Sequence, residues 1–184
     1  MRGEGDYGGS MKAQIAPSIL TSDIGNLDRE IARISKADLV HVDVMDGHFV
    51  PNLTWGLPVV EEVVRNGTLP VDVHLMIENP DRWAVQYAQA GAVSVTFHAE
   101  ATTSPITLAR NLRAAGAKAA VAFRPTTDLG FYREFLDEFD MILVMTVEPG
   151  LGGQKFLEPT LEKIREVREA ITASGADVLL EVDG

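Results

Sequence analysis

Residues 39–45 read LVHVDVM, and this stretch decides the fold. Alternate residues of a β-strand point to opposite faces, so His41 and Asp43 share one face while three valines share the other. The stretch VDVHLM, further along the chain, repeats the arrangement and sets Asp72 and His74 opposite to apolar side chains. The valine faces suit contact with a layer of helices. The polar faces must lie where charges can pair or bind a metal, because burying an unpaired charge is very costly.

Similar short runs rich in valine, isoleucine and leucine recur outward from this stretch and alternate with helical patterns. The seven expected strands are Ile15–Leu20, Leu39–Met45, Val71–Met76, Val93–His98, Ala117–Phe123, Met141–Val147 and Val178–Asp183. This alternation predicts an α/β fold with a parallel sheet and crossover helices. An open doubly wound sheet and a TIM (β/α)8 barrel both satisfy it. Ionisable side chains on the inner faces of several strand ends favour the barrel, which draws functional residues from many strands.

The composition is that of an ordinary folded domain. The 184 residues include 16 basic and 27 acidic ones, a formal charge of −11, which argues against a nucleic-acid partner. The chain has no cysteine, so disulfides and thiolate metal sites are impossible and a cytoplasmic location is expected. No apolar run approaches the roughly 20 residues of a membrane span, so no membrane partner is expected. We expect a flexible leader over residues 1–10 and one barrel domain over residues 11–184.

Four inward residues form the strongest candidate constellation: His41, Asp43, His74 and Asp183. Imidazole combined with carboxylate suits one divalent metal ion, namely Zn²⁺, Fe²⁺, Mn²⁺ or Co²⁺. The alternative is a buried ion-pair network in which the histidines are satisfied core residues. Four such groups converging on one barrel mouth favour the metal site.

A glycine-rich loop, PGLGGQ at positions 149–154, directly follows the sixth expected strand. Successive backbone N–H groups in such a loop can form a concavity that binds an anion. The alternative is a mobile glycine turn. Because the loop stands at a strand end of the predicted barrel, we interpret it as a phosphate-binding site.

Five motifs, in order, resemble those of the ribulose-phosphate 3-epimerase family. They are APSIL (16–20), HVDVMDGHFVPN (41–52), DVHLM (72–76), MTVEPGLGGQKF (145–156) and EVDG (181–184). The resemblance implies metal-dependent interconversion of D-ribulose 5-phosphate and D-xylulose 5-phosphate through an enediolate, in the pentose phosphate pathway. Two residues of the fourth motif depart from the family pattern. Glu148 stands where asparagine is common, and Leu151 stands where phenylalanine is frequent.

The resemblance also implies roles for individual residues. Asp43 is the expected base and Asp183 the expected acid in one direction, with the roles exchanged in the other. The chemistry agrees with the residues themselves, because inverting a carbon beside a ketone needs one acid–base group on each side of it. The expected substrate-binding residues are Ser18, His74, Gly150, Leu151, Gly152, Gly153, Asp183 and Gly184. His98 and Glu181 are expected to support the site without reacting.

Two other functions stay open at this point. The same acid–base pair would serve a 3-epimerase of D-allulose 6-phosphate, and an incomplete barrel could bind metal or a partner without turnover. The last expected strand ends at Asp183, whereas the barrel has an eighth strand. We therefore expect a C-terminally truncated barrel, ended after strand seven, whose natural gene product continues and forms a homo-oligomer when full-length. The 184-residue chain alone is expected to be poorly soluble or nearly inactive.

Overall fold

The sheet of this protein contains six parallel strands within the residues that the structure describes. A computed structural model describes residues 13–184, so the leader expected over residues 1–10 lies outside the described residues. The strands are adjacent in chain order: β1 (Val40–Met45), β2 (Val71–Met76), β3 (Ser94–His98), β4 (Lys118–Phe123), β5 (Met141–Met145) and β6 (Leu179–Asp183). Every neighbouring pair is parallel. This order confirms the predicted α/β fold with crossover connections.

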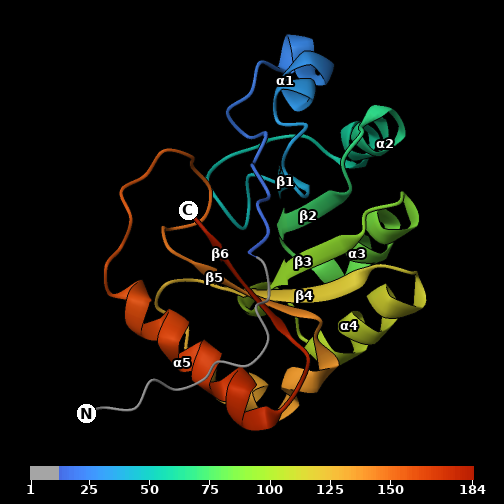
Figure 1. The fold of residues 1–184 in the computed structure, drawn as a ribbon. Helices are drawn as coiled ribbons and strands as arrows, with labels where there is room; N and C mark the ends of the chain where they lie inside the picture. The colour runs from blue at the N-terminus through green and yellow to red at the C-terminus, as the bar shows by residue number, and fades with distance from the viewer. Residues whose placement is uncertain (1–12) are drawn as a thin grey trace.

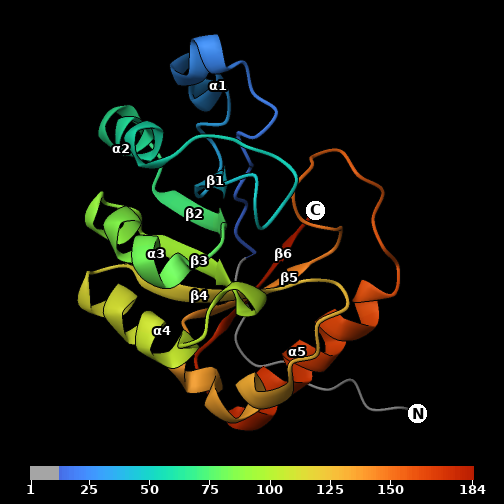
Figure 2. The ribbon, with the colours of Figure 1, turned by 180° about the vertical axis from the view of Figure 1, so that it is seen from behind.

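Helices occupy the connections and lie outside the curved sheet, as Figures 1 and 2 show from opposite sides. The α-helices are α1 (Leu27–Arg33), α2 (Leu57–Asn66), α3 (Pro80–Gln89), α4 (Pro105–Ala114) and α5 (Thr160–Ser174), and the 3₁₀ helices are η1 (Ile24–Asn26), η2 (Ala99–Ala101) and η3 (Gly130–Glu138). Both α3 and α4 begin with a proline, whose missing N–H would be unpaired there in any case. None of the described helices is both long and apolar enough to cross a membrane.

The sheet curls so far that its first and last strands approach each other. His41 Nε2 in β1 lies 3.9 Å from Asp183 Oδ2 in β6, although β2 to β5 separate the two strands in the sheet. Parallel strands that curl around an inner face, with helices outside, are the arrangement of a TIM barrel. The described residues form a curled half-barrel of this kind, which confirms the predicted fold class.

The segment Ile15–Leu20 differs from the expectation, because it runs beside β1 without forming a regular strand. It joins β1 through one parallel bridge between Ser18 and His41. The N–H of His41 donates to the carbonyl of Pro17, and the N–H of Ile19 donates to the carbonyl of His41. Extending this ladder by one more pair would need an N–H on Pro17, and proline has none. Pro17 therefore stops the ladder on its N-terminal side.

The main apolar core lies between the sheet and the helices, as the alternation of side chains predicts. The valines of β1 and the apolar side chains at alternate positions of β2 belong to this core. The inner face carries two smaller apolar clusters, which contain Met45, Val50 and Met76, and Ala122, Leu143, Met145 and Val147. His41, Asp43, Asp72 and His74 share the inner face and are at most 3% exposed. The barrel interior is therefore partly polar, which buried charges tolerate only when they are paired or bind a metal.

Candidate active site

His41, Asp43, His74 and Asp183 converge inside the curled sheet. β1 carries the first two, β2 carries His74 directly opposite to Asp43 in the register, and Asp183 ends β6. One ligand atom from each of the four residues lies within 4.8 Å of the others. The curl of the sheet thus brings together at one place the residues that alternation sets on the inner faces of separate strands.

Two ring nitrogens and two carboxylates face one another at the centre of this cluster. His74 Nδ1 lies 3.3 Å from both Asp43 Oδ1 and Asp183 Oδ2. His41 Nε2 lies 3.5 Å from Asp43 Oδ1. These contacts have the geometry of ion pairs, and among the described residues neither nitrogen has a hydrogen-bond partner. Two buried nitrogens are therefore aimed at a common point without a bond to satisfy them.

Asp72 orients His41, although sequence reasoning set Asp72 inside the barrel without giving it a role. Asp72 Oδ2 lies 2.7 Å from His41 Nδ1, and Ser94 donates its hydroxyl hydrogen to the other oxygen of Asp72. A carboxylate only accepts hydrogen bonds, so the proton of His41 lies on Nδ1. This arrangement is typical of a metal-binding histidine, whose outer nitrogen donates to a carboxylate. The signal in the sequence was the shared inward face of Asp72 and His74.

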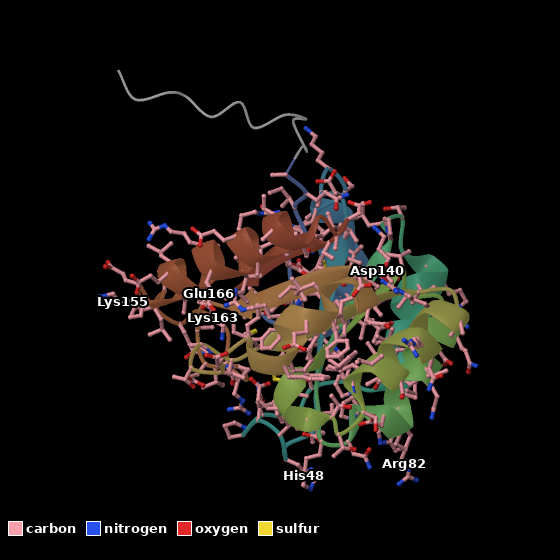
Figure 3. The ribbon with its side chains drawn as sticks, turned by 90° about the horizontal axis from the view of Figure 1, so that it is seen from below. His48, Arg82, Asp140, Lys155, Lys163 and Glu166 are labelled. Carbon is pink, nitrogen blue, oxygen red and sulfur yellow. The ribbon has the colours of Figure 1, made fainter. Side chains whose placement is uncertain are left out.

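His74 has a different outer partner. Its Nε2 lies 3.0 Å from Nε2 of His98, which ends β3, and His98 Nδ1 lies 3.2 Å from Glu100 Oε2. Burial lowers the pKa of His98 to about 4, so this ring is neutral near pH 7. The remaining histidine of the chain, His48, is exposed in the loop after β1 and points away from the sheet (Figure 3). Three of the four histidines therefore belong to one buried group.

When no ion is present, protons on the two histidines offset the negative charges of the carboxylates in the cluster. Burial disfavours ionisation of Asp43, but His41 and His74 outweigh burial and hold the pKa of Asp43 well below its usual range. Burial would also lower the pKa of His74, but the carboxylates of Asp183 and Asp43 outweigh it and raise that pKa to about 9. The pKa of His41 is raised against the effect of burial by Asp43 and Asp72. The carboxylates thus attract positive charge to the place where a cation would bind.

The residues present fit a divalent metal ion. Two unpartnered buried nitrogens and two carboxylates face one point, and the outer nitrogens of the histidines are held by Asp72 and His98. Neutral imidazole and carboxylate are common ligands of zinc, iron, manganese and cobalt. A cation in the cluster would satisfy both nitrogens and replace the protons that they otherwise bind.

A cavity of about 170 Å³ opens beside the cluster. Its lining includes seven of the expected substrate-binding residues: Ser18, Gly150, Leu151, Gly152, Gly153, Asp183 and Gly184. His74, the eighth, is completely buried and does not line the cavity, so it contacts the cluster rather than the open space. Asp43 lines the cavity and accepts a hydrogen bond from the hydroxyl of Ser18. Both aspartates of the cluster are therefore accessible to a molecule in the cavity.

The glycine loop is shaped by backbone conformations that favour glycine. Gly150 has a φ of 119° and Gly153 a φ of 71°. The side-chain amide of Asn52, in the loop after β1, donates to the carbonyl of Gly150 at 2.9 Å. Sequence reasoning gave Asn52 no role beyond its place in a family motif. The bond connects the loop after β1 to the glycine loop, which lines the cavity.

Thr146 holds the end of β6 in place. Its N–H and its hydroxyl both donate to the carbonyl of Asp183, at 2.7 Å and 2.9 Å. A Cβ on Gly184 would overlap the hydroxyl oxygen of Thr146, so only glycine fits next to Asp183 without displacing that side chain.

Fold and site together define a class of protein: a parallel β/α-barrel protein with a buried centre of two histidines and two aspartates at its strand ends. The sequence model of the ribulose-phosphate 3-epimerase family matches residues 14–184. The chain belongs to the ribulose-phosphate 3-epimerase family.

Relatives named ribulose-phosphate 3-epimerase are similar over nearly the whole chain. The protein from Mycobacterium tuberculosis is 54% identical over 180 residues, which cover 98% of this chain and 77% of the relative. The protein from Escherichia coli is 47% identical over 174 residues, which cover 92% of this chain and 77% of the relative. These homologues are epimerases, which are enzymes of the isomerase class.

Solved structures support the fold. A mutant of the tryptophan synthase alpha-subunit from Pyrococcus furiosus superimposes with a TM-score of 0.63, covering 92% of this chain and 86% of that chain. The two sequences are 9% identical, so the likeness concerns the fold alone.

Proposed function

We propose that this chain interconverts D-ribulose 5-phosphate and D-xylulose 5-phosphate by acid–base chemistry between Asp43 and Asp183. The observation that carries the proposal is the position of the two carboxylates. They come from strands at opposite ends of the sheet, both line the cavity, and each has an oxygen 3.3 Å from His74 Nδ1. Epimerisation beside a ketone needs such a pair, one group for each face of the reacting carbon.

In the forward direction, Asp43 removes the proton from the carbon beside the ketone and Asp183 supplies a proton to the opposite face of the enediolate. Ser18 donates a hydrogen bond to Asp43 and so limits the positions that this carboxylate adopts. In the reverse direction the two aspartates exchange roles. The pKa values of both aspartates lie below the usual range in the metal-free chain, because the cluster histidines outweigh the effect of burial. Asp183 must therefore take up a proton from solvent before the forward step, and Asp43 returns the proton that it removed to solvent after it.

A divalent ion completes this proposal. His41, Asp43, His74 and Asp183 would hold one Zn²⁺, Fe²⁺, Mn²⁺ or Co²⁺ ion. When bound, the ion supplies a Lewis acid that stabilises negative charge on the substrate oxygens. In this proposal Asp43 and Asp183 have two roles, because each binds the ion and each also transfers a proton.

The glycine loop and its neighbours are the proposed substrate contacts. Gly150, Leu151, Gly152 and Gly153 would face the phosphate, and Ser18, Asp183 and Gly184 would face the sugar. Backbone N–H groups suit a phosphate in a chain with a charge of −11, because they attract an anion locally without a basic side chain. His74 does not line the cavity and would affect the substrate only through its contacts with Asp43 and Asp183, which do.

The test is turnover of D-ribulose 5-phosphate, followed by NMR, in parallel with D-allulose 6-phosphate. Asp43→Asn and Asp183→Asn are each expected to lower turnover by on the order of 10²–10⁴-fold. Asp28→Asn is the matched control, since Asp28 is exposed in α1 and does not line the cavity. Faster turnover of the hexulose phosphate would reassign the substrate. Metal binding with no turnover of either sugar would indicate a non-catalytic barrel.

Two further parts of the proposal concern the whole protein. We propose a cytoplasmic location, supported by the absence of cysteine and by the similarity to metabolic enzymes. We also propose that the protein is a homo-oligomer. Light scattering at several protein concentrations tests the oligomer, and cell fractionation tests the location.

A further inference from the structure

The outer nitrogen of His74 meets another imidazole where His41 meets a carboxylate. His74 Nε2 lies 3.0 Å from His98 Nε2, the two ring planes are inclined by 23°, and both residues are completely buried. Two imidazole nitrogens at this distance form a hydrogen bond only when one carries a proton and the other has a lone pair. Two arrangements are therefore possible: either His74 Nε2 donates the hydrogen bond to His98, or His98 Nε2 donates it to His74.

Glu100 decides between the two arrangements. Its Oε2 lies 3.2 Å from His98 Nδ1, and its Oε1 accepts a hydrogen bond from the backbone N–H of Arg124 at 2.9 Å. A carboxylate only accepts, so the proton of His98 lies on Nδ1 and the lone pair lies on Nε2. The hydrogen bond between the two rings must then be donated by His74 Nε2.

Packing holds the His98 ring in this orientation. The ring of Phe49 lies against it, with centroids 4.8 Å apart. The guanidinium of Arg124 lies 4.4 Å from the centroid of the Phe49 ring and donates to the carbonyl of Phe49 at 3.0 Å. Arg124 therefore contacts both Phe49 and Glu100, and each of these residues contacts His98.

We propose that Glu100 and His98 act as a positioning pair, which keeps a proton on His74 Nε2, so that Nδ1 is the nitrogen of His74 that gives up its proton and binds a divalent cation. The inference rests on the metal site of the proposed function. His41 is oriented by a carboxylate directly, whereas His74 is connected to its carboxylate through one imidazole. Neither member of the positioning pair lines the cavity, so their effect on a metal is separable from contact with substrate.

The substitution Glu100→Gln tests the direction of the hydrogen bonds. A glutamine amide can donate to His98 Nδ1, which would favour a proton on His98 Nε2, opposite to the proton of His74. The dissociation constant for Zn²⁺, measured by competition with a chromophoric chelator, is expected to rise about 10–100-fold. Glu134→Gln is the matched control, because Glu134 is exposed in η3, and its constant should equal that of the unsubstituted chain. An unchanged constant in Glu100→Gln would overturn the proposal.

Two substitutions of His98 separate hydrogen bonding from packing. Glutamine and methionine have similar size and flexibility, but only glutamine has an amide oxygen that accepts a hydrogen bond from His74. His98→Met is expected to weaken Zn²⁺ binding about 10–100-fold, and His98→Gln by less than about tenfold. Equal losses in both would show that His98 acts through packing alone and would overturn the proposal.

The ring protons can also be located without any substitution. ¹⁵N-resolved NMR of the histidine rings, with and without Zn²⁺, is expected to show the proton of His98 on Nδ1 and a proton on His74 Nε2 in both states. A proton on His98 Nε2 would overturn the proposal. A chain that binds no Zn²⁺ would refute the metal site of the proposed function, while the ring protons of the metal-free chain would still decide this inference.

Discussion

His41 Nδ1 donates a hydrogen bond to Asp72 Oδ2 at 2.7 Å, and the two residues are partners in the register of β1 and β2. This bond turns His41 Nε2 toward Asp43 and Asp183. A carboxylate on the outer nitrogen fixes the ring and increases the basicity of the inner nitrogen. Two adjacent positions on neighbouring parallel strands are thus sufficient to prepare one metal ligand.

Removing the charge of Asp72 is expected to weaken the metal site. Asp72→Asn retains the size of the side chain and an oxygen that accepts from His41, but a neutral amide makes His41 Nε2 less basic. We expect the dissociation constant for Zn²⁺ to rise about 10–100-fold in a chelator-competition titration. Ser94→Ala removes only the hydroxyl that donates to Asp72, so its effect should be smaller. A larger loss in Ser94→Ala than in Asp72→Asn would contradict this assignment.

Metal affinity is expected to increase with pH. In the metal-free chain the pKa of His74 is about 9, because Asp183 and Asp43 outweigh burial, so below pH 9 its ring must lose a proton when a metal binds. The raised pKa of His41 adds a second proton of the same kind. The dissociation constant for Zn²⁺ should therefore fall by at least about tenfold per pH unit between pH 6 and pH 8.

The matched experiment for this pH dependence uses His74→Gln, which removes one of the two protons. For this variant, the plot of the logarithm of the Zn²⁺ dissociation constant against pH should be less steep by about one proton per ion bound. Zn²⁺ should also bind more weakly at every pH. Equal slopes for both chains would mean that His74 does not release a proton to the solvent.

Neutralising Glu181 is expected to stabilise the metal-free chain at high pH. Burial, followed by the charge of Asp72, raises the pKa of Glu181 from 4.5 to about 7. The folded state therefore binds this proton more tightly than the unfolded state, and stability falls as pH rises from 4.5 to 7. Glu181→Gln removes this loss, which is about 3 kcal/mol, and should raise the Tm at pH 8 by roughly 6–12 °C.

At pH 4 the same substitution should leave the Tm nearly unchanged, because the carboxyl group is then largely protonated in both states. Thermal unfolding by circular dichroism at pH 4 and pH 8, with a chelator present, provides the comparison. A stabilisation that is equal at both values would assign the effect to packing instead of charge.

The two glycines of the cavity loop that have a positive φ, Gly150 and Gly153, are expected to differ in their sensitivity to substitution. A Cβ on Gly150 would lie 3.0 Å from the Cβ of Val50, whereas a Cβ on Gly153 would meet nothing within 4 Å. Gly150→Ala should therefore displace the loop and raise the KM for D-ribulose 5-phosphate by about tenfold or more, which corresponds to about 1.4 kcal/mol. Gly153→Ala carries only the backbone cost of its φ of 71° and should raise KM less. The reverse order would show that the loop moves away from Val50 when substrate binds.

Much of the site could be predicted from the sequence because a strand alternates its faces strictly. His41 and Asp43 are two residues apart, and so are Asp72 and His74, and any parallel strand must turn each pair to the same side. The valines between them could only face the helices, and they do. The fold class followed from the same pattern, since a sheet covered by helices with ionisable groups on its other face is typical of a barrel.

The segment Ile15–Leu20 shows where local pattern was insufficient. Its apolar residues suit a strand, but the missing N–H of Pro17 leaves one bridge to β1. Propensity describes the side chains, whereas a ladder depends on every backbone donor, including the one that proline lacks.

The sequence by itself determined which side chains face inward, because that depends only on the two-residue period of each strand. The expected barrel already grouped His41, Asp43, His74 and Asp183, but the tertiary structure decided which contacts these residues make. Asp183 reaches His74 only because the sheet curls until β6 approaches β1, and His98 rather than a carboxylate meets the outer nitrogen of His74 because β3 lies beside β2 in the observed register. Such distances depend on the curvature and stagger of the whole sheet, which sum small contributions from every strand pair and leave no mark at any single position of the chain.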